Sequence, residues 1–135
     1  MQNAKESQTA KFEHDPSEIR DRTFRFAVRV VRVCQHLDTL KGSAWTLSRQ
    51  LLRSGTSIGA NLEEAKAAHS KADFICKAEI ALKEARETVY WLRLIIAAEV
   101  LPPCRIAELQ SEAEEIAKVL GAIVVSAKSH LARSR

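Results

Sequence analysis

The sequence predicts an all-α protein, an antiparallel up-down-up-down four-helix bundle that assembles as a homo-oligomer. Apolar residues recur with the 3.6-residue period of an α-helix through most of the chain, whereas alternating strand patterns and Asn-Gly or Asp-Gly hairpin turns are missing. Short connections separate the long helical segments, an arrangement that favours antiparallel neighbours. Two of these segments carry more apolar surface than one core requires, and this excess predicts self-association.

Length and composition indicate one compact domain. The 135 residues are enough to bury about two thirds of the unfolded surface, and the formal net charge of +4 permits contact with nucleic acid without requiring it. Three scattered cysteines without a CxxC pair favour a reducing compartment. The N-terminus is polar and the apolar runs are too short to span a bilayer, so we expect a cytoplasmic protein.

Capping and turn residues divide residues 15–135 into four helices, after a polar tail, residues 1–14, that we expect to be disordered. Asp15 as N-cap and Pro16 open the first helix, and Gly42 offers a left-handed position after it. Ser43 and Ser70 are the expected caps of the next two helices, and Pro102-Pro103 prevents the third from continuing. The helices are expected at about residues 16–40, 44–68, 71–98 and 103–132.

Two glycines one turn apart, Gly55 and Gly59, lie beside the apolar stripe of the second helix. Each costs about 1 kcal/mol relative to alanine inside a helix. We therefore expect another backbone to approach this helix closely at the two glycines.

A polar set interrupts the same helix and faces polar residues of the third. A polar cluster at a bundle seam costs stability unless it is fully paired, and such clusters commonly fix register and partner choice. It is interpreted either as a hydrogen-bonded register lock or as a ligand or catalytic site. This polar seam comprises Ser54, Ser57, Asn61, Glu84, Glu87 and Thr88.

The first and third helices have apolar residues on more than one face. On the first they spread over more than half of the circumference, at about 100° per residue, and the third has a second stripe on its far side. We expect another copy of the chain to cover this surface; the alternative is that neighbouring helices of the same bundle cover it. The expected interface residues are Phe26, Val30, Val33, Ile80, Trp91 and Leu94.

Four arginines on one face of the first helix, Arg22, Arg25, Arg29 and Arg32, give the clearest functional cue among the residues. Guanidinium groups this close repel one another unless solvent or anions match them, and RNA or DNA phosphate is one such anion. The alternatives are a solvated face or pairing with carboxylates such as Glu84 and Glu87. The secondary candidates are Arg49, Arg53 and the basic C-terminus. Aromatic residues are scarce, which favours backbone binding over base recognition.

Patterns that carry catalysis or bind cofactors are lacking. The chain has no Glu-x-x-His of a di-metal bundle, and its four histidines fall in the tail, near helix ends or in a connection. Phosphate-loop and dinucleotide fingerprints are also lacking, and Cys34 and His36 at i and i+2 do not face each other. We expect neither a metal centre nor a cofactor, and we do not expect an enzyme.

The segments RSGTSIGANLEEA (53–65), Phe74-Ile75 and ALKEARETVYWL (81–92) resemble the bacterial four helix bundle protein family. That family includes proteins encoded in intervening sequences of large-subunit ribosomal RNA genes and is similar to the accessory variability determinant of diversity-generating retroelements. The resemblance covers about Phe24 to Leu131. It implies up-down bundles that form ring-shaped homopentamers, and retroelement members that bind nucleic acid and a reverse transcriptase.

Residues and resemblance together predict a non-catalytic, nucleic-acid-associated accessory protein that binds the phosphate backbone of RNA or DNA. The alternative from a different class is an oligomeric protein-interaction scaffold without nucleic-acid binding. Salt distinguishes the two, because phosphate binding weakens steeply as salt rises and apolar docking does not.

Overall fold

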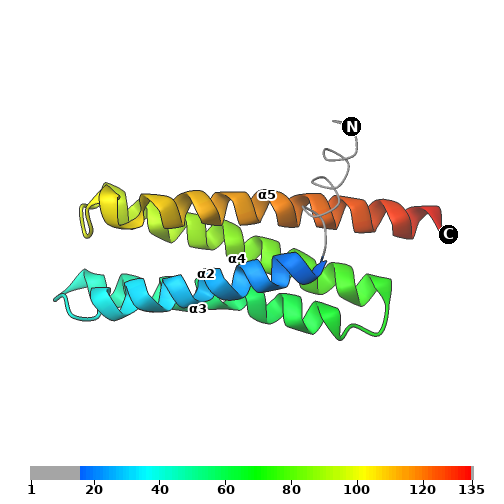
Figure 1. Cartoon of the computed structure of the whole chain (residues 1–135), viewed down its shortest axis with the longest axis horizontal. Helices are drawn as coiled ribbons and strands as arrows, with labels where there is room; N and C mark the ends of the chain where they lie inside the picture. Colours follow the sequence, from blue (N-terminus) through cyan, green and yellow to red (C-terminus); the bar gives the residue numbers. More distant parts are fainter. Residues whose placement is uncertain (1–15, 135) are drawn as a thin grey trace, which may run out of the picture.

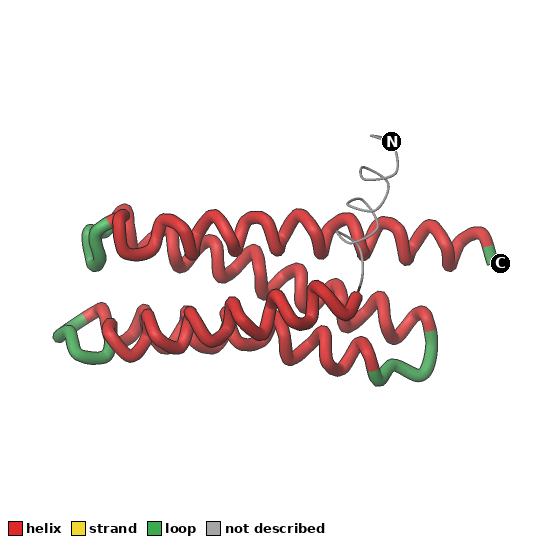
Figure 2. Tube along the Cα trace, viewed as in Figure 1, coloured by secondary structure: helices red, strands yellow, loops and turns green. Residues whose placement is uncertain are grey.

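The computed structural model describes residues 16–134, which form four helices and no strand. The expectations for the tail and for Asp15 lie outside the described residues. Figure 1 shows the helices running side by side, and Figure 2 shows how short their connections are. The helices are α2 (Pro16–Leu37), α3 (Ser43–Lys66), α4 (Lys71–Ala97) and α5 (Pro103–Arg133).

The helix ends differ from expectation at the first connection. α2 ends at Leu37 rather than near Leu40, and Gly42, with φ of 80°, takes the N-cap position of α3 without a side-chain cap bond. The expectation that Ser43 caps α3 is therefore wrong, because the left-handed turn at Gly42 makes Ser43 the first helical residue. The Ser70 cap is confirmed: its Oγ accepts the backbone N–H of Asp73 at 3.1 Å.

Each helix packs against its neighbours in the chain, and α5 also contacts α2 across a less extensive interface. In Figure 1 the connections 38–42 and 98–102 lie at one end of the molecule and the connection 67–70 lies at the other. One continuous apolar core runs between the helices. Its largest fully buried apolar side chains are Phe26, Val30, Leu37, Leu51, Ile58, Leu92, Ile95, Ile106, Ile116 and Leu120.

The glycines of α3 face α2, and the prediction of a close backbone holds only in part: a backbone neighbour is present at Gly59, whereas the close neighbour of Gly55 is the side chain of Val30. A Cβ added at Gly55 would lie 2.8 Å from Cγ1 of Val30, and one at Gly59 would lie 3.6 Å from the carbonyl carbon of Thr23. Reciprocal hydrogen bonds join the helices further along, since Ser48 Oγ donates to the Cys34 carbonyl at 3.2 Å and Cys34 Sγ to the Ser48 carbonyl at 3.4 Å.

The expected interface residues of α2 lie in the protomer's own core. Phe26 and Val30 are 1% and 0% exposed and Val33 packs against the core, so the expectation that Phe26 and Val30 contact another copy is wrong. The cause is helical phase: these residues share a face with Ile19 and Leu37, and that face meets the other helices. The apolar side chains of α2 that reach solvent are Phe24, Val28 and Val31.

On α4 the expected interface residues are partly buried. Trp91 packs against the core of its own protomer, and Ile80 and Leu94 are intermediate in exposure. This face therefore offers less free apolar surface than the sequence pattern alone indicates.

Candidate nucleic-acid interface

The predicted arginine face of α2 lies beside an acidic face of α5. Arg22 forms a two-pronged contact with Glu112, in which Nε donates to Oε2 at 3.1 Å and Nη2 to Oε1 at 2.5 Å. The hydrogen bond that Arg22 donates to Glu112 raises the pKa of Arg22 above its ordinary value, and partial burial opposes that rise. Arg22 thus forms part of the seam at which α2 packs against α5.

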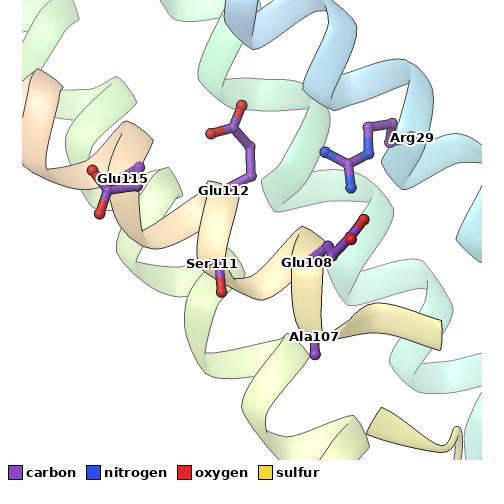
Figure 3. A pocket seen from close by; sticks show the side chains of 6 residues that line it. All are labelled: Arg29, Ala107, Glu108, Ser111, Glu112 and Glu115. Carbon is purple, nitrogen blue, oxygen red and sulfur yellow. The ribbon is translucent and has the colours of Figure 1, made fainter. Parts of the chain in front are cut away.

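Arg29 lies on the same seam. It lines a shallow pocket of about 460 Å³ together with Glu108, Ser111 and Glu112. Figure 3 shows its guanidinium group pointing from α2 toward the Glu108 and Glu112 carboxylates of α5. The carboxylates that match the arginine face therefore come from α5, and the alternative pairing with Glu84 and Glu87 is wrong for this helix.

All of the six candidate arginines except Arg22 are exposed, and three of them, Arg25, Arg32 and Arg49, form no ion pair with another helix of the described part of the chain. Arg25 pairs with the exposed carboxylate of Asp21, at 3.3 Å, a surface pair of the kind that contributes little. Arg32 is exposed, and Arg49 is exposed with its guanidinium carbon 4.5 Å from the centroid of the Trp45 ring. Such stacking leaves the guanidinium donors of Arg49 free to contact an anion.

Arg53 of α3 pairs with carboxylates of α4. Its guanidinium group forms ion pairs with Glu84, at 3.4 Å, and with Glu87, whose Oε1 also accepts from Trp91 Nε1 at 3.4 Å. The bond from Arg53 lowers the pKa of Glu87, whereas burial raises the pKa of Glu84 and the Arg53 charge opposes that rise. This cluster ties α3 to α4.

The structure brings together only part of the polar seam. Thr88 Oγ1 of α4 lies 2.9 Å from Ser54 Oγ of α3, a contact that links the two helices, and 2.7 Å from the Glu84 carbonyl of its own helix. Ser57 and Asn61 instead donate to carbonyls of their own helix. Every buried side-chain nitrogen or oxygen of the described residues has a partner, a state compatible with a register lock.

Sequence reasoning missed the contacts that depend on register between distant helices. The Arg22–Glu112 pair joins residues 90 positions apart, and the Arg49–Trp45 stack places two large side chains on one face of α3. The i, i+4 spacing of the stack was a usable signal, whereas the ion pair had none.

Two further findings concern the described residues. Within the described part of the chain, no three His, Cys, Asp or Glu side chains converge as metal ligands would. None of α2 to α5 combines the length and the apolar character that crossing a lipid bilayer requires.

The fold and its charged seams define an all-α protein of four helices in which ion pairs join α2 to α5 and α3 to α4. The chain belongs to the 23S rRNA-intervening sequence protein family, whose sequence profile matches residues 16–122. It is similar to a solved structure from Bacteroides thetaiotaomicron, described as a protein with unknown function from the S23 ribosomal protein family. The identity is 44% and the TM-score 0.74, over 78% of this chain and 97% of that chain. No curated protein matches the chain.

Proposed function

We propose that this chain is a non-catalytic, nucleic-acid-associated accessory protein of the cytoplasm that binds the phosphate backbone of RNA or DNA. The observation that carries the proposal is the division of the arginines on α2 and α3. Arg22 and Arg53 pair with carboxylates of neighbouring helices and Arg29 faces two such carboxylates, whereas Arg25, Arg32 and Arg49 are exposed and pair with no other helix among the described residues. Exposed guanidinium groups of this kind bind phosphate, and the family's link to a ribosomal RNA intervening sequence makes RNA the first probe.

The same proposal includes a homo-oligomer of antiparallel up-down-up-down bundles, with a ring of five copies as the expected form. The alternating connections of Figure 1 support the helix order. Five of the seven large apolar side chains most exposed among the described residues lie on α2 and α3, which makes this helix pair the preferred contact surface. This outer apolar face comprises Phe24, Val28, Val31, Trp45 and Leu52.

The first test measures RNA binding while salt is varied from roughly 50 to 200 mM. The variant Arg25→Gln/Arg32→Gln/Arg49→Gln should bind a structured RNA more weakly than the unaltered protein, with a log–log salt slope reduced by about 2 to 3, since each lost phosphate contact removes about 0.7 to 0.9. Light scattering should show the same oligomer for both proteins.

The matched control replaces three exposed cations outside the candidate set, Lys66→Gln/Lys71→Gln/Arg105→Gln, with the same change in net charge. Equal loss of binding in both variants would mean that overall charge acts rather than these arginines. A protein that binds neither RNA nor DNA even at low salt would overturn the proposal.

The second candidate is an oligomeric protein-interaction scaffold, and the outer apolar face is the observation that favours it. Trp45 is 50% exposed and Phe24 is 68% exposed, and aromatic side chains of this kind are enriched at protein interfaces. A scaffold keeps its partner at moderate salt, because apolar docking is only weakly screened.

A further inference from the structure

The outer face of α4 carries a second group of cations together with one exposed aromatic ring. Lys83, Arg86, Tyr90 and Arg93 occur at positions i, i+3, i+7 and i+10, which at about 100° per residue places them within an arc of about 80°. All four are exposed, and Tyr90 is 54% exposed. We call this set the basic–aromatic stripe.

The cations of the basic–aromatic stripe form no ion pair with residues 18–134, because the neighbouring carboxylates of α4 are engaged elsewhere. Glu84 and Glu87 pair with Arg53 of α3, and Glu79 pairs with Lys128 of α5. The stripe therefore presents three cationic side chains to solvent along one side of a helix. This differs from the arginine face of α2, where carboxylates of α5 lie close by.

The ring of Tyr90 packs against the neighbouring ring of Trp91. It meets the Trp91 ring edge to face, with centroids 5.0 Å apart and planes at 73°. Trp91 is itself packed against the core and donates to Glu87, which Arg53 holds. A half-exposed ring supported in this way is already ordered, so stacking a base on it costs little further entropy.

We propose that the basic–aromatic stripe is a binding track for single-stranded nucleic acid, in which Lys83, Arg86 and Arg93 contact successive phosphates and Tyr90 stacks on a base. From Lys83 to Arg93 the helix rises about 15 Å, enough for several nucleotides. Backbone contacts combined with one aromatic platform bind single strands without sequence preference. This inference rests on the proposed function, but it assigns a different surface and a preferred form of nucleic acid.

The test is fluorescence anisotropy of a labelled oligouridylate with the full chain, over roughly 50 to 200 mM salt. Lys83→Gln/Arg86→Gln/Arg93→Gln should lower the log–log salt slope by about 2, because a single strand contributes about 0.7 per phosphate contact. Tyr90→Ala should weaken binding by about 5- to 150-fold, the range that removal of one stacking ring covers. Tyr90→Phe keeps the ring and should bind like the unaltered protein.

Three controls separate the outcomes. The Lys66→Gln/Lys71→Gln/Arg105→Gln variant matches the loss of charge and should change binding far less. A duplex RNA probe should respond little to Tyr90→Ala, because its bases are already stacked. Circular dichroism and light scattering establish that the stripe variants keep their helices and their mass.

Undiminished binding by both stripe variants, with loss only in Arg25→Gln/Arg32→Gln/Arg49→Gln, overturns this inference and leaves the proposed function standing. A change of mass in the stripe variants also overturns it, because the stripe is then a contact between copies. If the unaltered protein binds neither the oligouridylate, nor a structured RNA, nor DNA, both the inference and the proposed function are overturned.

Discussion

Among residues 16–134, Glu99 is the one residue other than glycine with a positive φ, at 58°. It follows the C-cap of α4, where its N–H donates to the Ile96 carbonyl and that of Val100 donates to the Ile95 carbonyl, both at 3.0 Å. These are the two bonds of a Schellman motif. A residue with a Cβ pays about 1 to 2 kcal/mol for this conformation. Glu99→Gly should therefore raise the free energy of unfolding by about 1 kcal/mol, measured by urea denaturation, after glycine's greater chain entropy is subtracted.

Alanine is the matched control at this position. Glu99→Ala removes the carboxylate but keeps the Cβ, so its unfolding free energy should stay within about 0.5 kcal/mol of the original. Equal stabilisation by alanine and glycine would show that the carboxylate, rather than the backbone angle, carries the cost.

Single residues differ in how well their role can be predicted from the sequence. Ser70 followed by Asp73 has the composition of an N-cap, and the structure contains that bond. Glu99 gives no such signal, because glycine or asparagine is the usual residue at a left-handed C′ position. Local chemistry thus predicts a cap only where the residue type is one that the cap favours.

At the scale of the element, Gly55 and Gly121, two of the three helix-interior glycines among the described residues, should respond to alanine with opposite signs. A Cβ at Gly55 would lie 2.8 Å from Val30 Cγ1, whereas one at Gly121 meets nothing within 4 Å. Gly55→Ala should cost about 1 to 3 kcal/mol by overpacking, and Gly121→Ala should add about 1 kcal/mol through helix propensity. Adding Val30→Ala should recover part of the Gly55→Ala loss; a stabilising Gly55→Ala alone would contradict the close approach.

The sequence predicts least well which face of a helix points toward the core. The apolar residues of α5 recur on a single face, and Ile106, Leu109, Ile116 and Leu120 on that face are buried. α2 has apolar residues on two faces, so the periodicity predicts a helix but leaves open which face is internal. The buried face contains Phe26 and the exposed one contains Phe24, a distinction set by packing against α3 and α5.

At the scale of the whole molecule, contacts between α2 and α5 could not be predicted from one chain. The Arg22–Glu112 pair depends on the register of two helices at opposite ends of the described sequence, and nothing local to either residue encodes that register. The glycines of α3 did predict close packing, because a helix-interior glycine is costly without it. The energetic cost of a local feature, such as a glycine inside a helix, can be recognised in the sequence, whereas the partner of a contact between distant residues cannot.

The uneven packing predicts an order of local stability. α3 and α4 each pack extensively against two neighbours, whereas α2 packs extensively only against α3 and meets α5 across the less extensive seam. Amide hydrogen exchange should therefore be slowest in α3 and α4 and fastest in α2. Arg22→Ala should speed exchange further in α2, because it removes the paired charge of the seam, and should leave α4 unchanged; Arg32→Ala, an exposed arginine of the same helix, is the control. Equal protection of all four helices would contradict the order, and α2 protection that rises with protein concentration would instead locate the contact between copies on that helix.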